Sequence, residues 1–350
     1  MDHLVSTAEL PYPDGWFAVA FEHEVPPGRV IRRRLAGEDI VVYRTQQGEL
    51  RVVAPYCPHL GAHLGYGGTV SGEDIVCPFH HFAFGPDGTC VRTGYGTRPP
   101  KMRLQAYECR DRNGTIMVWR HANGLGPQWE LPELRDESFP QPIRKLTLLP
   151  AYPQDINENA FDSGHFPTLH GYRSAISTAC SFEGVRSTSS MITERCFPLL
   201  GALRFPLETE GYGVGFTHIR AGIPQIRAEA DTYFFSTPLE PRLMELRVLA
   251  SLRLGTGRGS QPGAASITSA LSWLLTRTLG PSMRTDLNAD MPVWSNKAYV
   301  DRPRLAEGDG PITRYRRWAR QFYSVPSGPD RPAVTADLSR PGRSRVPEHN

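Results

Sequence analysis

Two short motifs, each pairing a cysteine with a histidine, restrict what this chain can fold into more than any other feature of its 350 residues. Cys57-Pro-His59 and Cys77-Pro-Phe-His80 are separated by 17 residues. Two thiolates and two imidazoles match the ligand set of a [2Fe-2S] cluster in which cysteines hold one iron and histidines hold the other. Because neutral imidazole donates less charge than thiolate, such a cluster has a potential of roughly −150 to +300 mV, above that of an all-cysteine cluster. The motifs therefore predict a one-electron store.

A structural zinc ion is the alternative, since two cysteines and two histidines also complete a tetrahedral Zn²⁺ site. In a zinc finger a helix usually follows the second ligand pair. Here both pairs lie in segments rich in Gly and Pro, residues 56–68 and 77–88, which read as loops. Glycines let backbone N–H groups approach the sulfides of a cluster, so these loops favour the iron–sulfur interpretation.

On these motifs, residues 54–94 resemble the Rieske domain of Rieske non-haem iron oxygenases. The resemblance implies that Cys57, His59, Cys77 and His80 are the ligands of a Rieske [2Fe-2S] cluster.

Neighbouring residues are not expected to join this ligand set. His81 and Phe82 stand where a Gly-Trp pair is common in the family, a departure that leaves the four ligands in place. His63 would be a fifth ligand, for which the cluster has no position, so a local hydrogen-bonding or packing role is predicted. Cys90 follows an Asp-Gly turn and is predicted to be a small buried side chain.

A second group of polar residues lies downstream and indicates chemistry beyond electron storage. Glu158, Asp162 and His165 are spaced i, i+4 and i+7, so they would share one face of a helix. The helix is predicted to begin at Asp155, which forms a capping pair with Glu158.

The end of that helix is expected to bring two histidines together. Pro167 disfavours regular helix at the residue before it. A bend there would turn His170 back toward His165, which straight helical spacing of five residues would not do. Two histidines and one carboxylate form the facial triad of a mononuclear Fe(II) oxygenase.

Two histidines on a buried helix are by themselves more often packed against other side chains or hydrogen-bonded than bound to a metal. The iron interpretation is favoured here because a predicted cluster motif lies upstream in the same chain. The pattern also resembles the mononuclear-iron motif of the same oxygenase family. The resemblance implies that His165 and His170 are iron ligands and that Asp162 links the iron to a cluster.

The third iron ligand has three candidates. In the family it is an Asp from late in the catalytic domain, and Asp290 precedes Trp294 in the family's Asp-x-x-Ile/Val-Trp pattern. Asp290 is therefore favoured over Asp286, and Asp231, in a strand-like segment, is a remote third.

Composition fits a two-domain enzyme and excludes other classes. The net charge is only +3 and no basic run carries interleaved aromatics, so nucleic acid is not an expected partner. The N-terminus lacks signal-peptide features, and the most hydrophobic short stretch, residues 270–276, is far below the ~20 residues that cross a bilayer. A cytoplasmic protein that does not span a membrane is expected. The six cysteines show no disulfide framework.

The chain is predicted to be α+β, with an N-terminal all-β Rieske domain and a catalytic domain made of an antiparallel sheet plus helices, for which the resemblance implies a helix-grip fold. The expected divisions are an N-terminal segment (1–14), the Rieske domain (15–121), a linker (122–142), the catalytic domain (143–325) and a disordered tail (326–350). Strands are predicted over residues 16–21, 40–43, 115–119, 187–196, 211–220, 228–236 and 243–254. The Gly-rich run at 254–264 lacks the strand context of a dinucleotide site.

A C-terminal helix is predicted to start at Gly310-Pro311. Its apolar stripe is expected to pack in the core and its arginines to be solvated. The stripe consists of Ile312, Tyr315, Trp318 and Phe322, and the arginines are Arg314, Arg316, Arg317 and Arg320. Docking of an acidic ferredoxin or reductase on the arginines is the alternative.

The resemblance covers residues 10–325 and implies a terminal oxygenase component, with monooxygenation favoured over dioxygenation or desaturation. A separate ferredoxin and/or flavin-dependent ferredoxin reductase would supply electrons from NAD(P)H, with O₂ as co-substrate and Fe(II) as the second cofactor. The branch resembled contains 3-ketosteroid 9α-hydroxylase oxygenase components and cholesterol 7-desaturases, so a hydrophobic, steroid- or sterol-like substrate is expected. An aromatic or natural-product substrate is one alternative, and a Rieske electron-transfer protein without catalysis is another.

The resemblance also implies a homotrimer. In it, electrons would cross from the cluster of one subunit to the iron of its neighbour through Asp162, most directly from His80.

Overall fold

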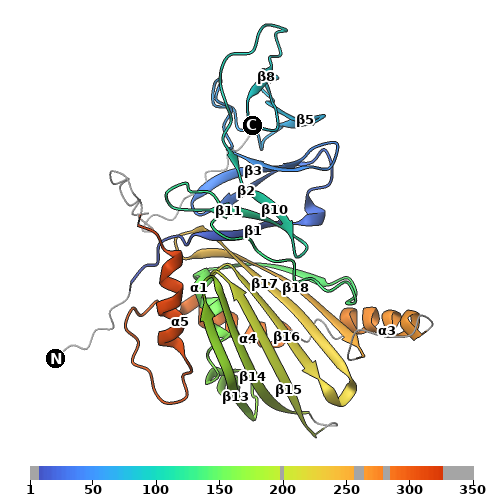
Figure 1. The fold of residues 1–350 in the computed structure, drawn as a ribbon, viewed down its shortest axis with the longest axis vertical. Helices are drawn as coiled ribbons and strands as arrows, with labels where there is room; N and C mark the ends of the chain where they lie inside the picture. The colour runs from blue at the N-terminus through green and yellow to red at the C-terminus, as the bar shows by residue number, and fades with distance from the viewer. Residues whose placement is uncertain (1–7, 198–200, 256–263, 279–283, 326–350) are drawn as a thin grey trace, which may run out of the picture.

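The computed structural model describes residues 8–197, 201–255, 264–278 and 284–325. Small antiparallel sheets form the upper part of the molecule and one large antiparallel sheet with helices forms the lower part (Figure 1). The predicted α+β architecture, a β-rich domain followed by an antiparallel sheet with helices, is confirmed.

Three sheets make up the N-terminal domain. Their orders are β1-β11-β10, β2-β3-β4-β9 and β5-β6-β7-β8, all antiparallel. The strands are β1 (Gly15–Phe21), β2 (Val30–Leu35), β3 (Glu38–Arg44), β4 (Leu50–Val53), β5 (Thr69–Ser71), β6 (Asp74–Val76), β7 (Ala83–Phe84), β8 (Cys90–Arg92), β9 (Ala106–Tyr107), β10 (Cys109–Arg112) and β11 (Thr115–Arg120). The three strands predicted here coincide with β1, β3 and β11.

The C-terminal domain is built on one seven-stranded sheet of order β12-β18-β17-β16-β15-β14-β13. Its strands are β12 (Ile143–Leu149), β13 (Ser174–Glu183), β14 (Arg186–Phe197), β15 (Gly201–Tyr212), β16 (Phe216–Ile223), β17 (Ala228–Glu240) and β18 (Leu243–Leu254). The prediction of a single strand over residues 211–220 is wrong. A turn at Gly213, whose φ of +61° favours glycine, divides that segment between β15 and β16.

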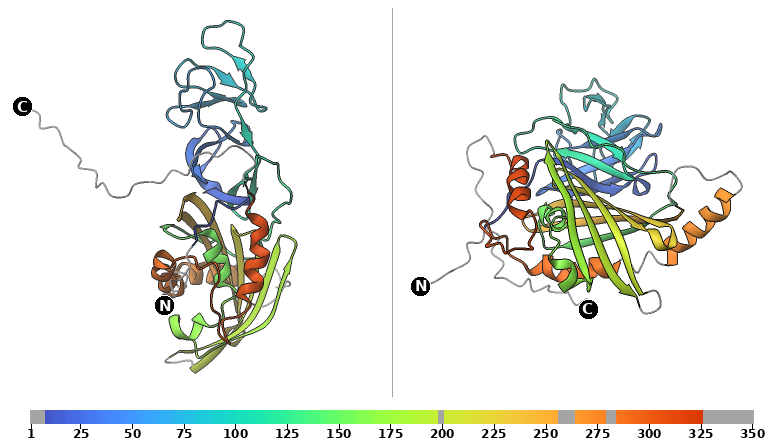
Figure 2. Two further views of the ribbon diagram at one scale, coloured as in Figure 1. Left: turned by 90° about the vertical axis from the view of Figure 1, so that its left-hand side faces the viewer. Right: turned by 60° about the horizontal axis from the view of Figure 1, so that its bottom comes forward.

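Helices cover one face and one edge of this sheet (Figures 1 and 2). They are α1 (Pro153–Asn159), α2 (His165–Leu169), α3 (Ala264–Thr278), α4 (Arg284–Asn296) and α5 (Ile312–Ala319). The α5 stripe is buried as predicted, because Ile312, Tyr315 and Trp318 are each less than a tenth exposed. One arginine departs from the predicted solvated face: Arg316 lies partly buried and pairs with Glu158.

A buried arginine joins the two domains. Arg247 of β18 is 1% exposed and donates hydrogen bonds to the carbonyls of Ala18 and Val19, at 2.8 and 2.7 Å. These carbonyls lie where the β1–β11 register shifts, between Ala18 and Ala20. A bulge leaves a residue without a partner in the ladder, so the guanidinium satisfies backbone oxygens that the bulge frees and holds the small domain on the large sheet.

The segment between β11 and β12, residues 121–142, contains no helix or strand, and Leu131 joins the apolar cluster between the domains. No helix among the described residues is long and apolar enough to cross a membrane. Residues 326–350 and most of the Gly-rich run at 254–264 lie outside the described residues, so the expectations for these two segments stay predictions.

Candidate functional site

Two similar turns carry the cysteine–histidine motifs. The Cys57 carbonyl accepts a hydrogen bond from Gly61 N–H at 2.9 Å, and the Cys77 carbonyl accepts one from His81 N–H at 3.1 Å. The fourth residue after each cysteine is left-handed, with φ of +76° at Gly61 and +55° at His81. The departure at His81 therefore places a side chain where the turn favours glycine.

The two turns bring all four predicted cluster ligands together at the end of the N-terminal domain. The thiols of Cys57 and Cys77 are buried in one cluster of side chains and form no disulfide. The imidazole rings of His59 and His80 have centroids 5.0 Å apart.

This donor set fits a [2Fe-2S] cluster. Burial, with Cys77 beside it, raises the pKa of the Cys57 thiol to about 11. A bound cation would be needed to hold the Cys57 thiol as a thiolate at neutral pH. The roles of the four residues as ligands remain predictions.

The neighbouring residues behave as predicted. His63 accepts a hydrogen bond from Gly65 N–H at 3.0 Å, and its Nε2 lies 3.3 Å from Asp39. Cys90 is 5% exposed. Phe82 stacks on the His59 ring with centroids 4.2 Å apart, so it orients a predicted ligand.

Gly94→Ala is expected to reduce cluster occupancy sharply. A Cβ at Gly94 would lie 2.2 Å from the His80 carbonyl oxygen, so the backbone of a predicted ligand would have to move. The measurement is iron and sulfide content together with the electron-resonance signal of the reduced cluster. Gly126→Ala is the matched control, because nothing lies within 4 Å of the added Cβ there. Full cluster content in Gly94→Ala would contradict this account of the loop.

The second motif folds differently from the prediction. Helix α1 begins at Pro153, not at Asp155, because proline suits the first helical position and Asp155 accepts a hydrogen bond from Tyr152 N–H at 3.1 Å. The helix ends at Asn159, so Glu158, Asp162 and His165 do not share one helical face.

Glu158 also points away from the histidines. It forms a bidentate ion pair with Arg316, at 2.7 and 2.8 Å, and is 7% exposed. Its role is to join α1 to α5, which fixes the segment that precedes the histidines.

The chain bends before the histidines, not at Phe166. Pro167 lies inside the one-turn helix α2, and His170 N–H donates to the Phe166 carbonyl at 3.2 Å. This turn achieves the predicted result, since the rings of His165 and His170 have centroids 5.0 Å apart.

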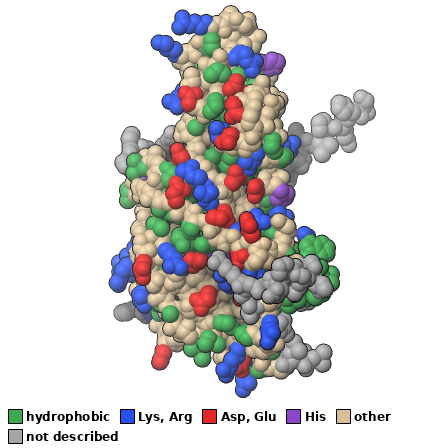
Figure 3. All heavy atoms as spheres, turned by 45° about the vertical axis from the view of Figure 1, so that its right-hand side comes forward, with side chains coloured by type: hydrophobic (Ala, Val, Ile, Leu, Met, Phe, Trp, Pro, Cys, Tyr) green, Lys and Arg blue, Asp and Glu red, His purple; other side chains and the backbone are tan. Residues whose placement is uncertain are grey.

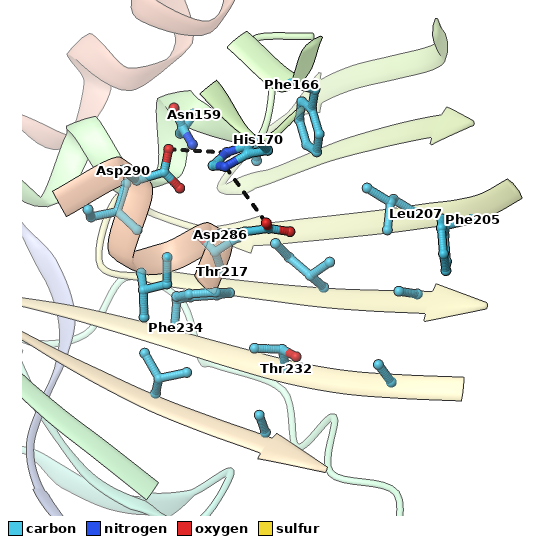
Figure 4. Close-up of a pocket in the computed structure, with 18 of the residues that line it drawn as sticks. Asn159, Phe166, His170, Phe205, Leu207, Thr217, Thr232, Phe234, Asp286 and Asp290 are labelled. Atoms are coloured by element: carbon cyan, nitrogen blue, oxygen red, sulfur yellow. Dashed lines mark ion pairs between the residues drawn. The ribbon is translucent and has the colours of Figure 1, made fainter. Parts of the chain in front are cut away.

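Helix α4 supplies the carboxylate that meets them. His165, His170 and Asp290 each offer a ligand atom within 4.8 Å of the others, and His170 and Asp290 are buried. The Nε2 of His170 lies 3.3 Å from Asp290 Oδ1 (Figure 4). The structure thus brings together the three residues predicted as iron ligands, and their roles as ligands remain predictions.

Asp286 lies on the other side of the same ring. Its Oδ1 is 4.0 Å from His170 Nδ1, and its carboxylate accepts hydrogen bonds from Tyr172 and Arg195 at 3.1 and 3.0 Å. Burial, followed by the charge of Asp286, raises the pKa of Tyr172 to about 12, so this hydroxyl stays protonated as a donor. Asp286 therefore lies where a carboxylate would orient a ligating imidazole.

Asp231 is not part of the site. It accepts hydrogen bonds from Tyr233 at 2.7 Å and lies 2.6 Å from His218. Its neighbours Ala230 and Thr232 line the cavity beside the histidines, so Asp231 points to the opposite face of β17.

Asp162 lies at the surface beside His165. Its Oδ2 is 3.6 Å from His165 Nδ1, it accepts a hydrogen bond from Gly164 N–H at 2.9 Å, and its side chain is 34% exposed. Burial alone would raise the pKa of Asp162, but the His165 ring and the backbone N–H groups hold it below the ordinary value. The carboxylate therefore faces both the imidazole and the surface.

Sequence reasoning missed Asn159, Tyr172 and Arg195. Asn159 Nδ2 lies 3.2 Å from His165 Nε2. Asn159 lies three residues before Asp162 inside the motif, a spacing that could have placed it near the histidines. No local pattern links Tyr172 and Arg195 to Asp286, because the contacts span 114 and 91 residues.

An iron ion fits this arrangement. The buried Nδ1 atoms of His165 and His170 lie beside Asp162 and Asp286, where these carboxylates would orient the rings and leave the other ring nitrogens to a metal. Two imidazoles and one carboxylate, with the rest of the site open to a cavity, form the donor set of a facial triad.

The triad opens into an apolar cavity of about 310 Å³ between the large sheet and helices α1 and α4 (Figure 4). Alternate residues of the sheet strands point into it. Its wall includes Phe205, Leu207, Thr217, Ile219, Ala230, Thr232, Phe234, Val248, Ala250 and Leu252. Such a wall suits an apolar ligand held beside the triad.

Comparison with known protein families gives two matches that follow the two domains. Residues 15–108 match the Rieske [2Fe-2S] domain, and residues 118–323 match the 3-ketosteroid 9alpha-hydroxylase C-terminal domain.

Full-length relatives are similar across most of the chain. Cholesterol 7-desaturase nvd of Xenopus laevis is 29% identical over 351 residues, which covers 90% of this chain and 73% of the relative. The oxygenase component of 3-ketosteroid-9-alpha-monooxygenase of Rhodococcus rhodochrous is 25% identical over 335 residues, covering 91% and 83%.

Solved structures share the fold. Dicamba monooxygenase bound to dicamba superposes with a TM-score of 0.66 at 15% identity, over 89% of this chain and 97% of that chain. NdmA of Pseudomonas putida CBB5 superposes with a TM-score of 0.62 at 16% identity, over 87% and 88%.

Proposed function

Because the chain belongs to the 3-ketosteroid 9α-hydroxylase C-terminal domain family and carries a Rieske [2Fe-2S] domain before it, we propose that it is a terminal oxygenase component acting on a steroid- or sterol-like substrate. The enzyme is an oxidoreductase of the Rieske oxygenase type, with a Rieske cluster and a mononuclear non-haem iron as cofactors. We assign the cluster to Cys57, His59, Cys77 and His80, and the iron to His165, His170 and Asp290. When bound, the two groups would supply stored electrons and the activation of O₂ for attack on a C–H bond.

The observation that carries the proposal is the position of the cavity. Its apolar wall ends at His165, His170 and Asp290, so a bound substrate would lie against the proposed iron ligands. Phe234 and Leu252 line the cavity and would give an apolar substrate an apolar contact surface. Thr232 is a polar group in the same wall and supplies a hydroxyl that could orient an oxygen-bearing substrate.

The relatives named for these domains carry out two related reactions. One is named a desaturase, which removes two hydrogens from its substrate, and the other a monooxygenase, which inserts one oxygen atom. We favour monooxygenation. The test is to incubate the purified chain with a surrogate reductase, ¹⁸O₂ and a panel of sterols and 3-ketosteroids, with aromatic compounds in parallel. Gain of one labelled oxygen atom supports hydroxylation, loss of two hydrogens indicates desaturation, and turnover of aromatic compounds alone contradicts the steroid assignment.

Ala250→Phe is expected to lower kcat/KM for the substrate at least about tenfold, because a phenyl ring would fill part of the cavity beside the triad. Iron content and the cluster spectrum should stay at wild-type levels. Ala202→Phe, at an exposed position of β15, is the matched control and should keep wild-type kinetics. Equal kinetics in the two variants would show that the substrate binds elsewhere.

A separate reductase or ferredoxin supplies the electrons in this proposal. The bacterial relative is named as an oxygenase component, which implies a distinct electron-transfer partner. We infer that its reducing equivalents come from NAD(P)H through a flavin.

We further propose a homotrimer in which electrons cross between subunits. Within one chain, the sheets β1-β11-β10 and β2-β3-β4-β9 lie between the cluster loops and the helices of the iron site, which argues against direct transfer (Figure 1). The cluster end of the molecule exposes large apolar side chains suited to a protein contact: Tyr56, Leu60, Tyr66, Phe79 and Tyr95. Asp162 is the residue we expect to meet His80 of a neighbouring subunit, because it faces both the surface and His165.

A further inference from the structure

Helix α3 has its polar and apolar faces reversed. A surface helix of a globular protein normally turns its apolar face to the core. In α3, Ser272 and Thr276 are 3% and 0% exposed, whereas Leu271, Trp273 and Leu274 are 45–50% exposed. The helix therefore presents large apolar side chains to its surroundings.

The buried hydroxyls explain how such a helix is held. Beyond Ala250, β18 no longer pairs with β12, so among the described residues no strand pairs with the end of its outer edge. Thr276 Oγ1 accepts from Leu252 N–H at 2.9 Å and donates to the Leu252 carbonyl at 3.1 Å. Ser272 Oγ accepts from Leu254 N–H at 3.0 Å. The helix is thus fastened to the sheet through hydrogen bonds between its hydroxyls and the strand backbone, while Leu271, Trp273 and Leu274 are about half exposed.

Trp273 is distinct among the tryptophans. It is 50% exposed, and Arg277 lies over its ring at 5.5 Å. The other five tryptophans, Trp16, Trp119, Trp129, Trp294 and Trp318, are buried or partly buried. An exposed tryptophan beside an arginine is typical of groups that sit at the boundary between water and lipid.

The charge of this region points to an anionic surface. Residues 246–285 contain no Asp, Glu or Lys and five arginines, of which Arg247 is buried between the domains and Arg253 is paired with Glu229 and Asp136. One of these, Arg277, lies exposed on α3 itself. Figure 3, which brings this side of the molecule forward, shows hydrophobic side chains gathered there.

The same helix is attached to a strand that forms part of the cavity wall. Leu252, whose backbone binds Thr276, turns its side chain into the cavity wall, as do Ala250 and Val248 of the same strand. α3 projects from this edge of the sheet (Figures 1 and 2). A substrate that approached along α3 would therefore reach the edge of the sheet that forms the cavity wall.

From these observations we propose that α3 is a peripheral docking face for an anionic lipid bilayer, from which an apolar substrate passes into the cavity. Leu271, Trp273 and Leu274 insert at the acyl boundary, and Arg277 contacts the lipid phosphates. The part that concerns substrate delivery rests on the proposed function, whereas the docking does not.

A second copy of the chain is a poorer occupant of this face. Three side chains that are each about half exposed offer on the order of 300 Å². A stable protein interface needs about 800 Å² from each partner. The absence of acidic residues from 246–285 also removes the opposite charges that would pair two such faces.

The docking is tested by vesicle flotation with the full chain. Vesicles of phosphatidylcholine with about a third phosphatidylglycerol should carry the wild type upward at low salt, and pure phosphatidylcholine vesicles should carry clearly less. The double variant Leu271→Ser/Leu274→Ser should bind at least about tenfold more weakly. Ile176→Ser/Ile192→Ser is the matched control, because this cross-strand pair is 61% and 45% exposed at the far edge of the sheet. The control should bind like the wild type.

A second measurement reports the docked face directly. Brominated lipids should quench part of the tryptophan fluorescence in the wild type, and Trp273→Phe should remove that quenching. Equal binding of both double variants, or quenching that persists without Trp273, would overturn the proposal. A different result would be that the wild type fails to bind vesicles and forms a larger assembly at high concentration that only Leu271→Ser/Leu274→Ser loses. That result would overturn the proposal and show that α3 binds a second copy of the chain.

Steroid turnover measured in two media separates a failure of membrane docking from a failure of the proposed function. If the proposal holds, Leu271→Ser/Leu274→Ser slows turnover of steroid supplied in vesicles but not of steroid supplied in cyclodextrin. Absence of steroid turnover in both media, with vesicle binding intact, would overturn the delivery step and the proposed substrate but leave the docking face. Vesicle binding needs no activity and so tests docking by itself.

Discussion

Asp290→Ala is expected to hold about two irons per chain where the wild type holds about three, and to lose substrate turnover. The carboxylate lies 3.3 Å from His170 Nε2 in a buried site, and two imidazoles alone would not retain Fe(II) against solvent. The Rieske absorption and electron-resonance signal should be unchanged, because the cluster loops lie in the other domain. His165→Ala and His170→Ala should behave in the same way.

Asp286→Ala is the matched control, one helical turn away on the same face of α4. Its carboxylate is 4.0 Å from the other nitrogen of His170, so it is expected to orient the ring and not to bind the metal. This variant should retain the mononuclear iron and measurable activity, at a level reduced about 10–100-fold. Loss of iron in Asp286→Ala with retention in Asp290→Ala would reverse the assignment of the third ligand.

Mixed assemblies are expected to regain activity that neither parent chain has. His80→Ala chains would lack a working cluster, and His165→Ala chains would lack the mononuclear iron. In a trimer that holds both, an intact cluster of one subunit lies beside an intact iron of another, so part of the wild-type turnover should return. The measurement is turnover after co-assembly of differently tagged chains, purified through both tags.

Asp162→Asn tests the residue proposed to connect the two sites. It should keep both metals and yet lose most of the activity, since the amide cannot replace a carboxylate that faces His165 at 3.6 Å and the surface. Asp309→Asn, an acidic residue that lines the same surface pocket, is the control and should remain active. Verified mixed trimers without recovered turnover would place electron transfer within one chain and remove this role from Asp162.

Local spacing predicted the parts of the molecule that depend on neighbours in sequence. The turns at Cys57 and Cys77, the buried stripe of α5 and strand β18 follow from residues a few positions apart, and the structure has them in the expected places. Two predicted elements were wrong because one local signal outweighed another. Helix α1 begins at Pro153, two residues before the start that the Asp155–Glu158 capping pair predicts. A turn at Gly213 divides residues 211–220, which the sequence predicts as one strand because they are largely apolar.

The sequence by itself determined the chemistry of the two centres, because the types of donor and their spacing within each motif are local properties. It favoured Asp290 over Asp286 through the position of Asp290 before Trp294, although both aspartates would share one face of a helix. Only the tertiary structure gives the two carboxylates different positions, because α4 packs so that Asp290 lies beside His170 Nε2 and Asp286 beside the opposite nitrogen. The pairing of Glu158 with Arg316, the bulge held by Arg247 and the reversed faces of α3 are likewise contacts between residues distant in sequence. Such contacts depend on which surfaces the fold brings together, so local sequence patterns do not predict them.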